Sequence, residues 1–299
     1  MTLSLVRQES KYLAIYELNK ERNYPIMIMC EILGVYRSSY YKWLKRDKSE
    51  NEKQNEEILG KIIEFYEEKN GAAGYRQVTM HLRNDENLHV NYKRVYRLMK
   101  IAGLKSICRR KKRRYTPSTP EITAENLLNR DFNAENIHQK WLTDVTEFKY
   151  GNGKKAYLSA ILDLGDRSIV SYVIGKSNNN PLVFETFDRA VEAYPDATPL
   201  FHSDRGFQYT NKVFKTKLND AGMTQSMSRV GRCIDNGPME GFWAILKTET
   251  YHWRRFQSYE ELEQAIDEYI SYYNHYRYQK RLNEMTPFQY RHYLNELAA

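Results

Sequence analysis

The stretch WLTDVTEFKYGNGKKAYLSAILDLGDRSIVSYVIGK, residues 141–176, decides the fold of the larger part of this chain. It contains three runs rich in β-branched and aromatic residues, separated by the turn sequences GNGK and GDRS. Runs of this kind joined by short turns predict an antiparallel meander of three strands. Asp144 falls inside the first run, where a carboxylate is costly unless it is paired or bound to a metal ion. An edge-strand aspartate that faces solvent is the alternative interpretation.

The segments after this meander complete a sheet. Residues 180–194 have a helical period, and residues 198–206 form a strand-like run. Residues 213–222 are again helical and precede a further short strand. The order βββαβαβα fits the ribonuclease H-like fold. We therefore expect an α/β core with a mixed five-stranded sheet and helices on both faces, preceded by all-α helix-turn-helix regions.

The first of two upstream helical blocks covers residues 9–46. Its pattern is helix, glycine-containing turn, helix, with Gly34 ending one helix and Ser38 as the expected N-cap of the next. This is the order of a helix-turn-helix, whose second helix can enter the major groove of DNA. A small helical bundle that does not touch DNA is the alternative.

The second helical block, residues 52–104, ends in a basic helix. The spacing of Ile58, Ile62 and Phe65 predicts a long first helix, and two shorter helices follow. The last helix has a basic stripe beside its apolar positions, made of Lys93, Arg94, Arg97 and Lys100. We expect Arg94 and Arg97 to contact DNA.

Six consecutive cations follow this block: Arg109, Arg110, Lys111, Lys112, Arg113 and Arg114. Charges this dense repel one another and rarely pack, so the segment is expected to be a solvated linker. A simple hinge is one interpretation. The position between two predicted domains favours a tether that binds DNA phosphates.

The composition agrees with a polyanion partner. The 299 residues include 46 Lys and Arg against 38 Asp and Glu, a formal net charge of +8. Cys30, Cys108 and Cys233 are few and far apart, which argues against a disulfide framework or a zinc site. Apolar runs stay well below the ~18 residues that span a bilayer, so we expect a soluble, intracellular protein without a membrane partner.

Three acidic residues in separate segments are the candidates for a metal site. Asp144 lies in the first strand, Asp204 ends a strand in HSDRGFQY, and Glu240 follows in DNGPMEGFWAILK, with 240 − 204 − 1 = 35 residues between the last two. Magnesium prefers hard oxygen ligands and keeps positions open for phosphate and water. Two such ions about 3.5–4 Å apart catalyse in-line phosphoryl transfer.

The local sequence predicts how Glu240 is presented. Asn236 is a suitable N-cap and Pro238 suits the first helical turn, so Glu240 should lie in that turn. Trp243 and Lys247 then share its helix face. A solvated surface lysine is the alternative for Lys247.

Other acidic residues and one histidine are assigned elsewhere. Turn chemistry explains Asp163 and Asp166, Asp235 is expected to help cap the helix, and Glu249 lies towards the packing side. His202 is expected to orient the loop of Asp204 rather than to ligate metal. These residues are therefore left out of the catalytic set.

Ordered motifs carry a resemblance to a known family. T-D-V-T, H-S-D-R-G-x-Q-Y and D-N-x-x-x-E occur in this order, with the 35-residue gap noted above and with Lys247 after the glutamate. The upstream GYRxV and RVxRLM segments and the Y-N-x-x-R and T-P-x-x-Y tail agree with it. Over nearly its whole length the chain resembles the catalytic second-frame protein of insertion-sequence family three (IS-three) transposases, in the DDE and retroviral-integrase superfamily.

The resemblance implies metal-dependent 3′-end cleavage and strand transfer of DNA. Asp144, Asp204 and Glu240 would be catalytic and would hold two Mg2+ ions, for which Mn2+ can substitute. Lys247 and Trp243 would contact DNA nearby. The implied partners are double-stranded DNA of the element ends and the target, further copies of the chain, and the first-frame transposase protein. The implied location is the bacterial cytoplasm, on the nucleoid when DNA is bound.

Two other functions stay open. The chain can be a transposase-derived DNA-binding regulator without catalysis, or a ribonuclease H-like nuclease that only hydrolyses. The expected domain limits are helix-turn-helix 1–50, helical DNA-binding region 51–107, basic linker 108–136, catalytic core 137–256 and helical tail 257–299.

Overall fold

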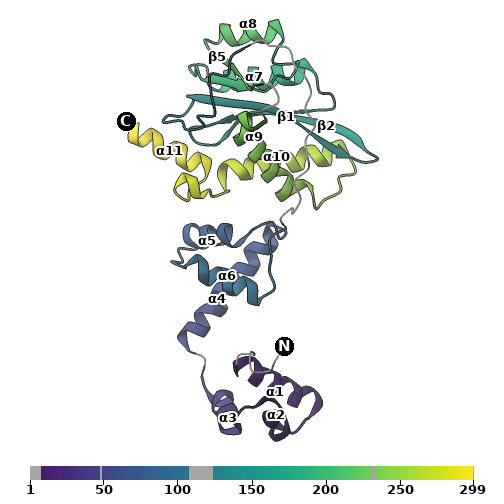
Figure 1. Cartoon of the computed structure of the whole chain (residues 1–299), viewed down its shortest axis with the longest axis vertical. Coiled ribbons are helices and arrows are strands. Elements are labelled where there is room, and N and C mark those ends of the chain that lie inside the picture. The colour runs from purple at the N-terminus through teal and green to yellow at the C-terminus, as the bar shows by residue number, and fades with distance from the viewer. Residues whose placement is uncertain (1–7, 48, 108–123, 230–232, 299) are drawn as a thin grey trace. The chain divides into compact units, whose positions relative to one another are not determined.

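The structure, a computed structural model, describes residues 8–47, 49–107, 124–229 and 233–298 (Figure 1). The chain divides into two compact units, Met1–Gly60 and Lys61–Ala299. The basic run of residues 109–114 lies outside the described residues.

The first unit contains the helices α1 (Gln8–Arg22), α2 (Ile26–Leu33) and α3 (Arg37–Lys45), and it also includes the first part of the helix that follows them. They pack around a small apolar cluster that includes Ile15, Cys30 and Tyr40. Gly34 ends α2 in the left-handed conformation, with φ +62°, as the sequence predicts. The prediction for Ser38 is wrong, because the extended N-cap residue is Tyr36 and Ser38 already lies within α3.

The second helical block of the sequence forms the helices α4 (Glu50–Glu68), α5 (Tyr75–Asn84) and α6 (Tyr92–Ile101). Val78 and Leu82 of α5 and Val95 and Leu98 of α6 are buried. Asn91 caps α6, since its side chain accepts a hydrogen bond from the Lys93 amide. The predicted helix pair is confirmed.

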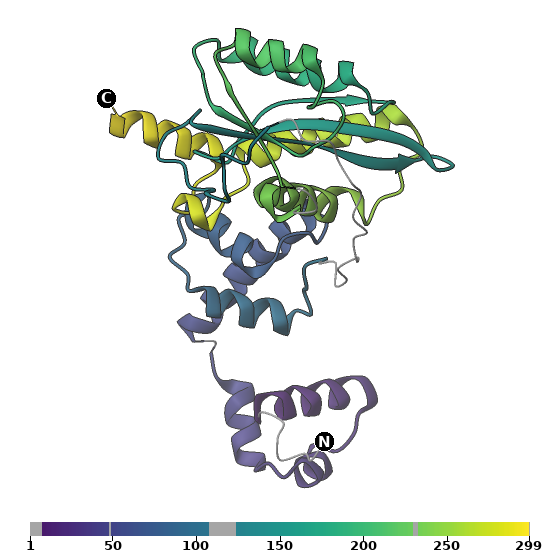
Figure 2. The ribbon, with the colours of Figure 1, turned by 45° about the horizontal axis from the view of Figure 1, so that its top comes forward.

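Within the described residues the core contains one five-stranded sheet in the order β3-β2-β1-β4-β5. The strands are β1 (Lys140–Tyr150), β2 (Lys154–Asp163), β3 (Ile169–Gly175), β4 (Leu200–Ser203) and β5 (Thr224–Met227). The β1, β2 and β3 strands form the predicted antiparallel meander, and β4 and β5 run parallel to β1. The mixed sheet is thus as expected. Figure 2 shows the long β1–β2 hairpin in teal.

Helices cover both faces of this sheet (Figure 1). One face carries α7 (Asn180–Ala193) and α8 (Lys212–Asp220), and the other carries α9 (Gly237–Leu246) and α10 (Tyr259–His275). Two apolar clusters fill the two interfaces. The remaining elements are η2 (Cys233–Asn236), η3 (Lys247–Tyr251), η4 (Lys280–Leu282) and α11 (Pro287–Ala298).

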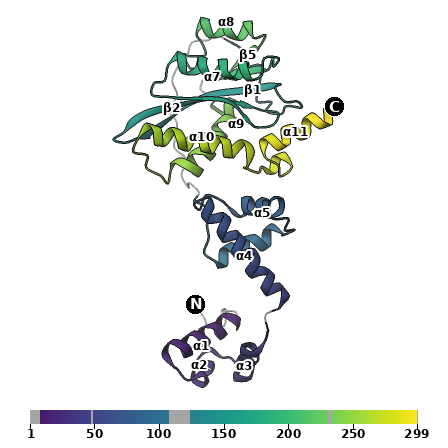
Figure 3. The ribbon, with the colours of Figure 1, turned by 180° about the vertical axis from the view of Figure 1, so that it is seen from behind.

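Helix α10 belongs to this core, although the expected boundary at residue 257 places it in a separate tail. Leu262, Ile266 and Ile270 of α10 are buried in the same cluster as Leu142 and Leu158 of the sheet. Figure 3 shows α10 lying along the sheet. The sequence pattern of an amphipathic helix does not reveal which surface the helix covers.

Candidate active site

The fold brings two of the three predicted carboxylates to the same level on neighbouring strands. Strands β1 and β4 are parallel, with Leu142 opposite His202. Asp144 and Asp204 each lie two residues further along the chain, so both project from the same end of the β1–β4 pair. Asp144 lies inside β1 and Asp204 follows the last residue of β4, as predicted.

The third carboxylate comes from a different element. Glu240 lies in the first turn of α9, with Asn236 at the N-cap position and Pro238 in the first turn, as expected. The side chain of Glu240 is exposed, whereas Asp144 and Asp204 are half-buried.

The electrostatics of the site show a concentration of negative charge. Burial and the neighbouring Asp204 raise the pKa of Asp144 to about 7, and Glu240 adds to this rise. Burial also raises the pKa of Asp204 and that of Glu240. Like charges and desolvation both disfavour ionised carboxylates, so a bound cation would stabilise the charged forms.

A divalent metal fits the donor set of this site. The three carboxylates are hard oxygen ligands, which Mg2+ prefers. In the part of the chain that the structure describes, however, there is no group of three or more His, Cys, Asp or Glu side chains placed to hold one ion.

Trp243 is directly involved in presenting Asp144. Its indole Nε1–H donates to Asp144 Oδ2 at 2.9 Å, and the residue is only 6% exposed. This hydrogen bond lowers the pKa of Asp144 and partly offsets the effect of burial. Trp243 is therefore buried against Asp144, and its expected contact with DNA stays a prediction.

Lys247 is bound to strand β1. Its ammonium donates to Thr146 Oγ1 at 2.5 Å and to the Glu147 carbonyl oxygen at 3.0 Å, and it lies 4.9 Å from the centre of the Phe148 ring. Lys247 begins η3, a π-helical turn directly after α9. Such turns are frequent at functional sites.

The loop of Asp204 is tightly built. The Gly206 amide donates to Asp204 Oδ1 at 2.8 Å. A side chain at Gly206 would meet Gln208 Oε1 at 2.9 Å and Asp204 Oδ1 at 3.0 Å, which explains the glycine. The loop therefore fixes the carboxylate through its own backbone.

His202 supports the strand below this loop. Its two ring nitrogens lie 2.9 Å from Ser226 Oγ and 3.1 Å from Ser228 Oγ, and the side chain is fully buried. Burial lowers the pKa of His202 to about 4, so the ring is neutral near pH 7. These contacts hold β4 to β5 and to the residues after β5, and the predicted role of His202 in orienting the Asp204 loop stays a prediction.

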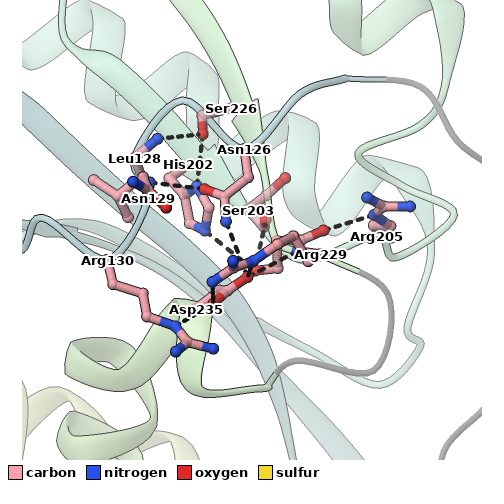
Figure 4. Close-up of polar contacts among 11 residues, drawn as sticks. Asn126, Leu128, Asn129, Arg130, His202, Ser203, Arg205, Ser226, Arg229 and Asp235 are labelled. Carbon is pink, nitrogen blue, oxygen red and sulfur yellow. Dashed lines mark hydrogen bonds and ion pairs between the residues drawn. The ribbon is translucent and has the colours of Figure 1, made fainter.

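Asp235 is the residue whose role the sequence did not reveal. It was expected to help cap α9, but its buried carboxylate is held by Arg229 and Arg130 instead (Figure 4). The arginines hold the pKa of Asp235 well below its usual range, with Arg229 as the largest cause. The neighbouring Asn236 donates to the Thr143 carbonyl oxygen at 3.0 Å.

The other acidic residues left out of the catalytic set have structural partners. Asp166 pairs with Arg291 of α11, and Glu249 pairs with Arg277 at 2.7 Å. Asp163 lies 3.2 Å from His138. These contacts account for the burial of Asp163 and Asp166 and for the partial burial of Glu249.

The predicted DNA contacts of the helical region are only partly described. Arg97 is exposed on α6, and Arg94 of the same helix is half-buried. Arg109, Arg110, Lys111, Lys112, Arg113 and Arg114 lie outside the described residues. Among the described helices, none is long and apolar enough to cross a membrane.

Comparison with protein families gives three matches along the chain. Residues 53–112 match an HTH-like domain, and residues 134–233 and 240–293 match two integrase core domain models. The break between the two integrase matches covers most of η2 and the start of α9, and Glu240 is the first residue of the second match.

Curated relatives are named as transposases or transposase-like proteins. The chain is 37% identical over 276 residues to transposase InsK for insertion sequence element IS150 from Escherichia coli, covering 92% of this chain and 96% of the relative. It is 42% identical to a transposase-like protein of Haemophilus influenzae, covering 69% of this chain and 95% of the relative. It is 27% identical to transposase InsF for insertion sequence IS3A from Escherichia coli, covering 94% of this chain and 98% of the relative.

Among solved structures, the magnesium complex of the HTLV-2 integrase catalytic core domain is similar, with 18% identity and a TM-score of 0.43, covering 54% of this chain and all of that one. With an HTH-like domain, an integrase core and these relatives, the chain belongs to the insertion-sequence transposases of family three.

Proposed function

We propose that this transposase cleaves DNA at the 3′ ends of its element and joins those ends to target DNA, with Asp144, Asp204 and Glu240 as the catalytic carboxylates. The observation that carries the proposal is the parallel register of β1 and β4, which puts Asp144 and Asp204 side by side with raised pKa values. Two Mg2+ ions, or Mn2+ in their place, would activate the attacking oxygen and stabilise the leaving oxygen.

The residues of the chain have distinct tasks in this proposal. Asp144 and Asp204 supply oxygen ligands, and their burial limits hydration of the site. Trp243 orients Asp144 through its indole N–H. Catalysis by positioning and charge neutralisation needs no covalent protein nucleophile.

We propose different roles for Lys247 and Trp243. The burial of Trp243 favours a role in orienting Asp144 over a DNA contact. Lys247 joins the end of α9 to β1 in the structure, and its contact with a DNA phosphate stays a prediction. A lysine bound to a hydroxyl and a carbonyl oxygen can exchange these neutral partners for a phosphate at modest cost, because ionic hydrogen bonds are the stronger ones.

The proposed partners are double-stranded element ends and target DNA, a second copy of the chain, and the first-frame protein. The net charge of +8 supports a polyanion partner. Exposed Arg97, together with Arg94 and the basic run 109–114, would contact phosphates. Joining two ends in one reaction supports assembly of more than one copy on DNA.

The test is a strand-transfer assay with purified full-length protein. Labelled duplexes from the DNA that flanks the gene are incubated with Mg2+ or Mn2+, with Asp204→Asn alongside. Joined product from the wild type alone supports the proposal. Hydrolysis without joining would favour the nuclease, and binding without chemistry, even with the first-frame protein added, would favour the regulator.

A further inference from the structure

A buried carboxylate outside the catalytic set has an unusually complete set of partners. Asp235 is 0% exposed. Its Oδ2 accepts from the Arg229 backbone amide, from Arg229 Nε and from Asn126 Nδ2, each at 2.9 Å. Its Oδ1 accepts from Arg130 Nε at 2.7 Å and from an Arg229 terminal nitrogen at 2.9 Å. We call Asp235, Arg229, Arg130 and Asn126 the Asp235 cluster (Figure 4).

The cluster joins segments that are far apart in the sequence. Arg229 follows strand β5, and Asn126 and Arg130 precede β1 by about ten residues or more. The segment before β1 is itself fixed to β5, because the Leu128 amide donates to Ser226 Oγ at 3.1 Å. Asp235 is therefore bound to the segment before β1 and to the residue after β5, and that segment is itself hydrogen-bonded to β5.

The residue that precedes Arg229 also contacts the loop of Asp204. The Arg205 Nε donates to the Ser228 carbonyl oxygen at 2.6 Å, and the Ser228 amide donates to the Ser203 carbonyl oxygen at 2.9 Å. The residues on either side of Asp204 thus hydrogen-bond to the residue that immediately precedes Arg229.

Asp235 is also close in sequence to Glu240. Asp235 lies in η2, and the next residue, Asn236, is the N-cap of α9 and donates to the Thr143 carbonyl oxygen beside Asp144. Glu240 is in the first turn of α9. An α-helix rises only about 1.5 Å per residue and is stiff, so fixing its start also fixes Glu240.

We propose that Asp235 is a positioning residue of the transposase: its ion pairs with Arg229 and Arg130 hold the start of α9 where Glu240 can join Asp144 and Asp204. This rests on the proposed function, since it concerns the site in which the three carboxylates act. Asp235 itself touches neither DNA nor metal in this role.

The exposure of the partners makes the role testable apart from folding. The side chains of Arg229 and Arg130 are 45% and 38% exposed. If Asp235 loses its charge, water can solvate both cations, and the neutral replacement is cheaper to bury than a carboxylate. Asp235→Asn should therefore fold while it loses most of the orienting force on α9.

A matched control is available in the same core. Asp166 is also 0% exposed and is also paired with an arginine, Arg291. Its partners are on α11 and in the β2–β3 connection, so Asp166→Asn perturbs a buried ion pair away from α9. Arg229→Met is a second variant of the Asp235 cluster. It removes the ion pair with Asp235 by changing an exposed side chain.

The experiment compares wild type, Asp235→Asn, Arg229→Met and Asp166→Asn as full-length proteins without DNA. Mn2+ binding is measured by electron paramagnetic resonance, and amide hydrogen exchange is measured in peptides that cover α9. We expect both cluster variants to bind Mn2+ about tenfold more weakly or worse and to exchange the first-turn amides of α9 about tenfold faster, because the ligand set is less preorganised. Asp166→Asn should match the wild type in both measurements.

Strand transfer separates this inference from the proposed function. If the wild type joins DNA, we expect the half-saturating Mg2+ concentration to rise about tenfold in Asp235→Asn, with joined product partly recovered at high Mg2+. Unchanged Mn2+ affinity and unchanged exchange in both cluster variants would overturn the positioning role, and so would equal effects in Asp166→Asn. A wild type that binds Mn2+ but never joins DNA would instead count against the proposed function.

Discussion

Replacing Asp144 with asparagine should stabilise the metal-free protein at neutral and alkaline pH. The wild-type carboxylate is half-buried next to Asp204, and both burial and this neighbour oppose its ionisation. The asparagine side chain would fill nearly the same volume without charge, and its amide oxygen can still accept the hydrogen bond from the Trp243 indole. The change thus removes an electrostatic cost and leaves the packing intact.

The magnitude follows from the pKa of Asp144, which rises from 3.8 to about 7 on folding. Each pKa unit corresponds to about 1.4 kcal/mol, so the charged form of Asp144 destabilises the folded state by at most about 4 kcal/mol. Solvent screening of a half-buried group reduces this, so we expect about 2–4 kcal/mol at pH 8. Because the folded state binds the proton more tightly than the unfolded state, this cost is absent below about pH 4 and grows as the pH rises towards 7.

Urea denaturation in the presence of EDTA at pH 5 and pH 8 measures this effect. We expect Asp144→Asn to exceed the wild type in free energy of unfolding at pH 8, and by half that amount or less at pH 5. Asp196→Asn is the control, since Asp196 is exposed in a loop and should change stability by about 0.5 kcal/mol or less. An Asp144→Asn variant that is no more stable at pH 8, or equally shifted at both pH values, would refute the reasoning.

Three further changes test other parts of the structure. Trp243→Phe removes the donor to Asp144, a charge-assisted bond worth about 1.5–3 kcal/mol, so strand transfer should fall about 10- to 100-fold while DNA binding in a gel-shift assay stays unchanged. Arg277→Met leaves the partly buried Glu249 without its guanidinium partner and should lower the free energy of unfolding by about 2–3 kcal/mol, measured in urea. Arg97→Ala should weaken DNA binding and reduce the slope of log affinity against log salt by about 0.9, for one lost phosphate contact.

Each of these has a clear contrary result. Full strand transfer by Trp243→Phe would show that the indole N–H does not orient Asp144 during the reaction. An Arg277→Met protein as stable as the wild type would mean that Glu249 finds water or another donor. An unchanged salt slope for Arg97→Ala would place DNA on a surface other than the exposed face of α6.

The local features of the site were predictable because they depend on neighbouring residues. A run rich in β-branched and aromatic residues placed Asp144 within a strand, and a strand followed by Arg205 and Gly206 placed Asp204 at its end. Pro238 located the first turn of α9, and hence Glu240. Each of these inferences uses a few consecutive residues and the known preferences of turns and helix starts.

The contacts that assemble the site depend on distant residues, and local patterns do not contain them. Asp235 looks like a capping residue beside Asn236, yet it pairs with Arg130, 105 positions away. The π-helical turn that begins at Lys247 carries Glu249, whose partly buried partner Arg277 is 28 positions away. Likewise, the indole of Trp243 is expected on a DNA-facing surface until the tertiary structure shows that Asp144 lies against it.

A change of metal specificity tests the central claim most directly, namely that Asp204 is a metal ligand in strand transfer. Cysteine replaces the carboxylate with a softer thiolate, which binds Mg2+ poorly and suits transition-metal ions better. Strand transfer by Asp204→Cys is measured in Mg2+ and in Mn2+, with the wild type in parallel. We predict no joined product in Mg2+ and partial recovery in Mn2+, whereas joining by Asp204→Cys in Mg2+ at the wild-type level would contradict the account.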